Sequence, residues 1–183
     1  MSELDQPIVI ETEDVLSLRE KITLTDVIQA EVRSMPFHLL TPDQFELLLW
    51  DLFYSDCNDT DLEFDNSRLM ITGADQGRDV WLTYDGEPSG LIQCKREEKK
   101  YARKDVLKEV VKFLLHSELT PALLPHPKAF TYCLALSTDP KGEVDDFFEK
   151  PLDWLKDNKT EVESVTKKVI ESYQRFKNTK SDD

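Results

Sequence analysis

Residues 73–96, GADQGRDVWLTYDGEPSGLIQCKR, contain two apolar runs separated by turn-forming residues. The run VWLTY, residues 80–84, is rich in β-branched and aromatic side chains and predicts a strand. Residues 85–90, DGEPSG, predict a six-residue hairpin loop because Asp, Gly and Pro favour turns. Residues 91–96 predict the returning strand. The stretch as a whole predicts an antiparallel hairpin that follows a turn rich in glycine and aspartate.

Further helices and strands are predicted on both sides of this hairpin. Thr41-Pro42-Asp43-Gln44 is a capping box with proline at the first helical position, so a helix is expected to begin there. Its inward stripe is expected to contain Phe45, Leu48, Leu49, Leu52 and Phe53. The other expected strands are one over 68–72 and a central buried strand over 129–137, and a short helix is expected over 25–34. A helix over 104–119 is expected to turn six apolar residues inward: Val106, Leu107, Val110, Val111, Leu114 and Leu115. A further helix is expected from Glu143, interrupted at Pro151, and a last one from the capping box Thr160…Glu163, burying Val162, Val165, Val169, Tyr173 and Phe176. This order predicts an α/β fold with a mixed central β-sheet flanked by helices.

The composition is that of a single globular domain. The chain has 183 residues, of which 39% are hydrophobic, and no apolar run approaches the ~18 residues of a membrane span. Its acidic start has no secretory signal pattern, and the three cysteines form no CxxC pair, so we expect a cytoplasmic protein without a membrane partner. We expect an acidic lead-in over 1–22, one domain over 23–176, and a charged tail or the start of a linker over 177–183.

The charge is distributed unevenly along the chain. The net charge is −14, but residues 1–65 alone hold 16 acidic and 3 basic side chains. Residues 95–112 hold eight basic side chains against four acidic ones. A local basic segment can contact phosphate even when the whole molecule is acidic. A solvated charged turn and helix face explains the segment equally well.

The predicted hairpin brings three polar side chains to one end of the sheet. If Tyr84 pairs with Leu91, Asp79 lies opposite Arg96, and a slip of one residue places it opposite Lys95. Gln93 and Lys95 are two residues apart and project from one face of their strand, whereas Ile92 and Cys94 project from the other. A carboxylate, an amide oxygen and a lysine therefore converge. Oxygen ligands of this kind suit Mg²⁺.

These residues resemble the PD-(D/E)xK nuclease superfamily, in particular its Mrr-like restriction-endonuclease branch. The resemblance lies in GADQGRDV, the IQCKR that follows, and the helical phrase FELLLWDLF, and it spans about residues 41–138. It implies a restriction-endonuclease-like three-layer sandwich. It also implies that Asp79 and the Gln93 oxygen bind the metal, that Glu46 completes the metal site, and that Lys95 is the catalytic lysine. In place of the second glycine usual before the aspartate, this chain has Gln76-Gly77-Arg78, and Arg78 is expected to contact phosphate or pair with a carboxylate.

The resemblance implies an Mg²⁺-dependent endonuclease, with Mn²⁺ as a substitute, that hydrolyses DNA, most simply double-stranded and with weak sequence specificity. The residues expected to grip phosphate are Arg96, Lys99, Lys100, Arg103 and Lys104. Similar domains resemble effectors of bacterial anti-phage systems, so the expected partners are DNA and either further copies of the chain or a fused or associated sensor NTPase module that activates cleavage. An inactive nuclease fold that binds nucleic acid or drives assembly is the alternative, and an RNA substrate is a further one.

Each candidate also has a reading without chemistry. Asp79 alone fits a cap at a strand start, and Asp75 fits an ordinary turn residue. Gln93 and Lys95 alone fit the solvent face of a strand, and Glu46 alone fits a solvated helix position. The nuclease interpretation depends on their coincidence, because crowding a carboxylate, an amide and an ammonium group together is costly without a use.

Overall fold

A computed structural model describes residues 12–19, 37–55, 63–70 and 77–177 of the chain. The chain divides into two compact units, one made of Met1–Glu98 and His126–Thr138 and the other of Lys99–Pro125 and Asp139–Asp183. The elements of the first unit are α1 (Thr12–Arg19), the 3₁₀ turn η2 (Phe37–Leu39), α2 (Pro42–Ser55), β1 (Asn66–Leu69), β2 (Val80–Tyr84), β3 (Glu87–Lys95), η4 (Pro127–Ala129) and β4 (Thr131–Leu136). Those of the second are α3 (Arg103–Leu119), η3 (Pro121–Leu123), α4 (Gly142–Glu149), α5 (Pro151–Asp157), α6 (Lys159–Ser172) and η5 (Gln174–Phe176).

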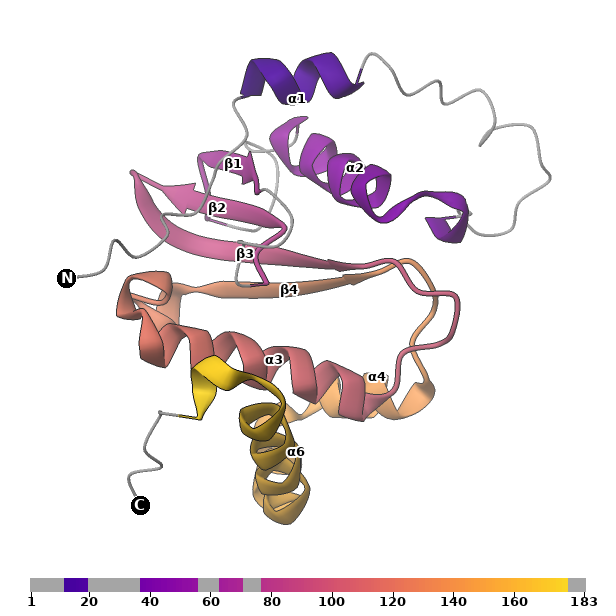
Figure 1. Cartoon of the computed structure of the whole chain (residues 1–183), viewed down its shortest axis with the longest axis vertical. Coiled ribbons are helices and arrows are strands. Elements are labelled where there is room, and N and C mark those ends of the chain that lie inside the picture. The colour runs from indigo at the N-terminus through magenta and orange to yellow at the C-terminus, as the bar shows by residue number, and fades with distance from the viewer. Residues whose placement is uncertain (1–11, 20–36, 56–62, 71–76, 178–183) are drawn as a thin grey trace. The chain divides into compact units, whose positions relative to one another are not determined.

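The first unit is built on a four-stranded mixed sheet in the order β1-β2-β3-β4 (Figure 1). β1 pairs with β2 and β2 pairs with β3 in antiparallel fashion, whereas β3 and β4 are parallel. The predicted mixed α/β class is therefore confirmed. The prediction that the strand over 129–137 lies centrally in the sheet is wrong, because β4 is at an edge of the four described strands.

One face of this sheet is covered by α2 and α1 (Figure 1). Alternate side chains of the strands, including Val80, Leu82 and Ile92, point into the core formed with these helices. From the helices, Phe45 and Trp50 of α2 are the largest buried side chains in this core. Burial of this apolar surface is what holds α2 against the strands.

The start of α2 agrees with the sequence prediction. The backbone N–H of Thr41 donates to Gln44 Oε1 at 2.8 Å, and the N–H of Gln44 donates to Thr41 Oγ1 at 3.2 Å, which is a reciprocal capping box. The predicted stripe is only partly correct. Leu47 and Trp50 are buried, whereas Leu52 is 52% exposed. The side of α2 that carries Trp50 faces the sheet, and the Trp50 Nε1–H donates to the Ser67 carbonyl of β1.

The hairpin between β2 and β3 is tighter than predicted. The two central residues of the turn are Asp85 and Gly86, with φ angles of 50° and 81°, and β3 already begins at Glu87. Two-residue turns with positive φ match the twist of the flanking strands, and an Asp-Gly pair is a preferred sequence for them. The predicted six-residue loop over 85–90 is therefore wrong, and every pairing derived from it shifts.

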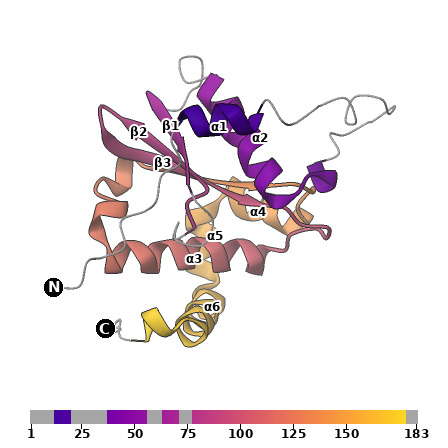
Figure 2. The same ribbon diagram turned by 45° about the horizontal axis from the view of Figure 1, so that its top comes forward.

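The second unit is a group of helices in which α6 runs across α3 (Figures 1 and 2). The break at Pro151 is confirmed by the division into α4 and α5. Within α3, Val106, Leu107 and Val111 are buried as predicted, but Phe113 is buried in place of the exposed Leu114. The last long helix begins at Lys159 after Asn158, so the predicted start at Thr160 is close but its capping box is not formed.

Some predictions lie outside the described residues. These are the helix over 25–34, and Asp75 in the turn before β2. The helix α1 was not predicted, since residues 12–19 fall in the segment expected to be an acidic lead-in. Its Val15 is buried in the core. Across the described segments, every helix is too short or too polar to cross a lipid bilayer.

Candidate active site

Asp79 is positioned at the entrance of β2 by backbone contacts. Its N–H donates to the Ile92 carbonyl at 3.2 Å, and its own carbonyl accepts from the Met70 N–H at 3.0 Å. Gly77, two residues earlier, has a φ of 83°, a conformation that favours glycine. The side chain of Asp79 is buried, and its Oδ2 accepts a hydrogen bond from the Cys94 N–H at 2.5 Å.

The register differs from both predicted pairings. Val80 pairs with Ile92, so Asp79 lies beside Gln93 and Cys94 instead of opposite Lys95 or Arg96. The short turn at Asp85 and Gly86 pairs Tyr84 with Glu87 instead of Leu91, and an irregularity between Leu82 and Thr83 then shifts the pairing back by one residue. Asp79 and Lys95 are still at the same end of the hairpin, because Asp79 contacts Cys94 and Lys95 is the next residue of β3.

The pKa of the Cys94 thiol depends on the charged groups near this end of the sheet. Burial raises the pKa of Cys94 far above its ordinary value, and the negative charges of Asp79 and Glu46 raise it further. The ammonium group of Lys95 acts on the same pKa in the opposite direction. Three of the four predicted catalytic residues therefore lie within electrostatic range of one sulfur atom, although Asp79 directly precedes β2, Glu46 is in α2 and Lys95 is in β3.

Gln93 occupies a different environment. It is only 1% exposed, and its Oε1 accepts a hydrogen bond from the Tyr132 hydroxyl at 2.5 Å. Cys94 belongs to the core under α2, so the alternation of β3 places Gln93 on the opposite face of the sheet. The same alternation places Gln93 and Lys95 on one face of β3, and Cys94 on the other face, against which α2 with Glu46 packs.

Tyr132 is a residue that the sequence analysis missed. It reaches Gln93 because β4 runs parallel to β3 with Leu91 beside Tyr132 and Gln93 beside Leu134. A tyrosine two positions into an apolar strand gives no signal by itself. The register of a parallel pair, which depends on the whole fold, would have been needed to find it.

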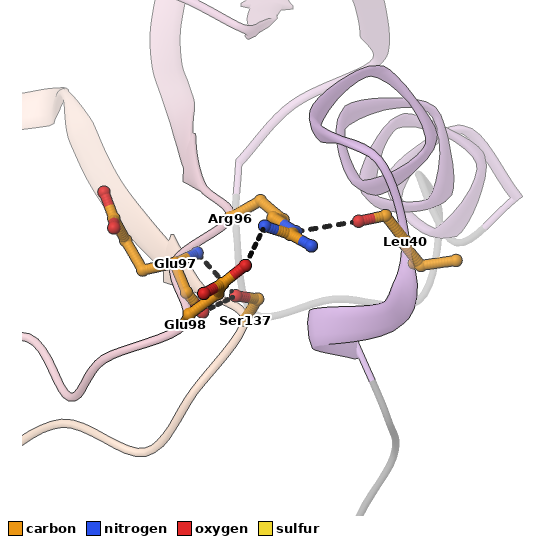
Figure 3. A network of polar contacts seen from close by, with 5 residues as sticks. All are labelled: Leu40, Arg96, Glu97, Glu98 and Ser137. Atoms are coloured by element: carbon orange, nitrogen blue, oxygen red, sulfur yellow. Dashed lines mark hydrogen bonds and ion pairs between the residues drawn. The ribbon is translucent and has the colours of Figure 1, made fainter.

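Arg96 joins the end of β3 to the start of α2 (Figure 3). Its Nε–H donates to the Leu40 carbonyl at 2.9 Å, and its Nη1 lies 3.5 Å from Glu98 Oε1. Leu40 directly precedes Thr41, the capping residue of α2. The guanidinium group therefore contacts the residue that leads, through Thr41, into the helix that carries Glu46.

The end of β3 is also fastened to β4 (Figure 3). The Glu97 N–H donates to Ser137 Oγ at 2.8 Å, and the Ser137 hydroxyl donates to the Glu97 carbonyl at 3.0 Å. The Ser137 N–H donates in turn to the Lys95 carbonyl at 3.1 Å. Lys95 is thus followed by a rigid connection and not by a loose loop.

The predicted phosphate-binding residues have different surroundings. Lys99, Lys100 and Lys104 are exposed. Arg103 is half-buried in the second unit, where its Nη2 lies 3.3 Å from Glu161 Oε2 and its guanidinium carbon lies 4.7 Å from the centre of the Trp154 ring. Those contacts stabilise the helical unit, so the lysines are the better placed to meet a phosphate.

Arg78, which directly precedes Asp79, is buried. Its guanidinium carbon lies 4.9 Å from the centre of the Trp81 ring, a cation–π contact within the sheet. This contact supports a structural role for the residue next to Asp79.

The donor set fits Mg²⁺ better than it fits a soft metal. Among the residues that the structure describes, no three His, Cys, Asp or Glu side chains are grouped as a metal site. Mg²⁺ needs only one or two carboxylates because it keeps several waters. Asp79 and Glu46, which act on the same thiol, supply that number.

Comparisons with known proteins give no independent assignment. No family model, no curated protein and no solved structure matches this chain.

Proposed function

We propose that the chain is a metal-dependent nuclease of the PD-(D/E)xK type, with a restriction-endonuclease-like fold, that hydrolyses phosphodiester bonds of DNA. The observation that carries this proposal is that the Asp79 carboxylate is fixed by the Cys94 N–H, while the charges of Asp79, Glu46 and Lys95 all act on the Cys94 thiol. Two carboxylates can hold a divalent cation, and a lysine nearby can orient or deprotonate the attacking water.

Each residue has a separate role in the proposed chemistry. Bound Mg²⁺ would supply charge neutralisation at the scissile phosphate and a lowered pKa of water. Asp79 would hold the cation, with its carboxylate fixed by the Cys94 N–H. Glu46 would supply the second carboxylate, and Lys95 would orient the attacking water or take its proton. Gln93, bonded to Tyr132, would contribute from the face of β3 that it shares with Lys95.

DNA is the proposed substrate because the resemblance to the PD-(D/E)xK superfamily implies it, and exposed lysines lie shortly after Lys95 in the sequence. Lys99, Lys100 and Lys104 would contact phosphates and position the duplex without reading bases. A net charge of −14 opposes unassisted binding to DNA, so we also propose that assembly with further copies or with an activating module raises the local affinity.

The test is cleavage of supercoiled plasmid and linear duplex at low salt with Mg²⁺ or Mn²⁺. The parent protein is compared with Asp79→Asn, which keeps an oxygen for the Cys94 N–H but removes the charge. Asp65→Asn is the matched control, because Asp65 Oδ2 likewise accepts one backbone N–H, that of Asp85. Lys95→Met is paired with Lys128→Met, which removes a charge from an exposed position in the same unit.

The expected result is metal-dependent cleavage that falls by at least about 10²-fold in Asp79→Asn and Lys95→Met, as for the loss of a group that acts in proton transfer. Both control variants should cleave like the parent. Equal cleavage by all five proteins would refute the site, and cleavage of RNA alone would refute the substrate.

A catalytically inactive nuclease fold is the second candidate, and the contacts of Gln93 favour it. The Gln93 oxygen already accepts from Tyr132, and the Asp79 carboxylate already accepts from Cys94, so both polar groups have a role in holding the sheet together. Calorimetry with Mn²⁺ separates the two functions, because an inactive module has no need to bind the cation.

A further inference from the structure

We propose that Arg96 is a positioning residue that sets the place of Glu46 relative to Asp79 and Lys95. The inference rests on the proposed function, since it concerns the geometry of the same cation site. It assigns Arg96 a role within the protein in place of the phosphate contact that its position in a basic segment suggests.

The first step is the connection from Arg96 to α2. The Arg96 Nε–H donates to the Leu40 carbonyl at 2.9 Å (Figure 3). Leu40 comes just before the capping box of Thr41 and Gln44, from which α2 continues without interruption through Glu46. A shift of Leu40 would move the whole first turn of the helix, and with it the Glu46 carboxylate.

The second step is the fixed base from which Arg96 reaches. Arg96 follows Lys95 directly, and the Lys95 carbonyl accepts from the Ser137 N–H of the β4 end. The paired hydrogen bonds between Glu97 and Ser137 hold the residue on the other side of Arg96. The arginine is therefore anchored at both neighbours, so its contact with Leu40 transmits the position of β3 to α2.

The third step concerns the side chain itself. The guanidinium group is planar and donates in fixed, diverging directions, so one edge can hold Leu40 while another faces Glu98. The Glu98 contact is at the surface, with the carboxylate side chain 79% exposed, and contributes little to stability. The Leu40 bond is the one that bears on the site, and a lysine can reproduce its charge but not its geometry.

The experiment is titration of the full chain with Mn²⁺ by calorimetry. The proteins are the parent, Arg96→Met, Arg96→Lys, Glu46→Gln, the double variant Arg96→Met with Glu46→Gln, and Lys128→Met as the control for loss of one positive charge. Circular dichroism and thermal melting report whether each variant is folded. Arg96→Lys keeps the test decisive where Arg96→Met is too unstable to titrate.

The expected result is a Mn²⁺ affinity about tenfold weaker in Arg96→Met, which is the usual cost of losing a group that orients a metal ligand. Arg96→Lys should lie between this variant and the parent, and Lys128→Met should match the parent. In the Glu46→Gln background, Arg96→Met should cause no further loss, because the two residues act through one carboxylate.

Four results would overturn the inference, and they differ in what they leave standing. Unchanged Mn²⁺ affinity in Arg96→Met removes the positioning role and leaves the nuclease proposal intact. The same holds if Arg96→Met weakens Mn²⁺ binding as much in the Glu46→Gln background as in the parent. It holds also if Arg96→Met only weakens DNA binding and reduces its salt dependence, because that result marks a phosphate contact. No Mn²⁺ binding by the folded parent removes the proposed function and the positioning role together.

Discussion

The Asp79 carboxylate accepts a hydrogen bond from the backbone N–H of Cys94, fifteen residues further along the chain. This contact crosses from the entrance of β2 to the end of β3, so the residue proposed to bind the cation also closes the hairpin. The two roles can be separated by substitution, because an asparagine keeps the acceptor oxygen and an alanine does not.

Asp79→Ala should destabilise the protein more than Asp79→Asn. Alanine leaves the N–H of the buried Cys94 without its acceptor, which costs about 1–3 kcal/mol. Asparagine keeps the bond, so its free energy of unfolding should stay closer to that of the parent. Urea denaturation of the three proteins measures the difference. Equal destabilisation by both substitutions would mean that charge, and not the hydrogen bond, carries the effect.

Tyr132→Phe should lower both stability and metal affinity. It removes only the hydroxyl that donates to Gln93 Oε1, leaving a buried amide oxygen without this donor at a cost of about 1–3 kcal/mol. Because the amide also loses its orienting group, Mn²⁺ affinity should fall by about tenfold. Denaturation and calorimetry test the two effects separately.

Gln93→Ala is the companion to that variant. It should weaken Mn²⁺ binding, and Tyr132→Phe should then add nothing. Tyr84→Phe, which changes an exposed tyrosine, is the matched control. A Mn²⁺ affinity that stays constant in Tyr132→Phe would restrict the Tyr132 hydroxyl to a structural role.

The sequence predicts much of the local structure and less of the site. The capping box at Thr41 and Gln44 depends on neighbouring residues alone, and it is formed as expected. The hairpin register failed because Asp85 and Gly86 make a two-residue turn, while Pro88 and Gly90 suggest a loop but lie in β3. The alternation along β3 separates Gln93 from Cys94, but only the packing of α2 decides which of them faces Glu46. The contacts to Tyr132 and Leu40 join distant segments and have no local signal.

Gly90→Ala should disrupt the pairing of β3 with β4. A Cβ atom at Gly90 would lie 2.8 Å from the Thr131 carbonyl oxygen and 3.3 Å from Leu82 Cδ1, so the strands would have to separate. Overpacking of this kind costs about 1–3 kcal/mol. Gly142→Ala is the control, because nothing lies within 4 Å of a Cβ there. Thermal melting of both variants makes the comparison, and a lower melting temperature for Gly142→Ala than for Gly90→Ala would contradict the strand packing.

The stability of the protein should fall at alkaline pH in part through Cys94. The thiol ionises near pH 9.0 in an unfolded chain, whereas burial and then the charges of Asp79 and Glu46 raise its pKa in the folded state. A raised pKa contributes stability that is fully present below pH 9.0 and decreases as the pH rises above it, because only the unfolded chain then releases the proton. Urea denaturation as a function of pH should therefore show a shallower decline for Cys94→Ala than for the parent. Parallel curves for the two proteins would contradict the raised pKa.

Alkylation of Cys94 should report the charges around it. In the folded parent the buried thiol should react slowly with iodoacetamide, since the thiolate is the reactive form. Asp79→Asn and Glu46→Gln each remove a negative charge that raises the pKa, so both should speed alkylation at a fixed alkaline pH, and Lys95→Met should slow it. Mass spectrometry of the peptide that contains Cys94 gives the rates, with Asp65→Asn as the control. Opposite shifts for the carboxylate and lysine variants would place all three groups beside one sulfur atom without any assay of cleavage, and rates that do not respond to these substitutions would remove the geometric basis of the site.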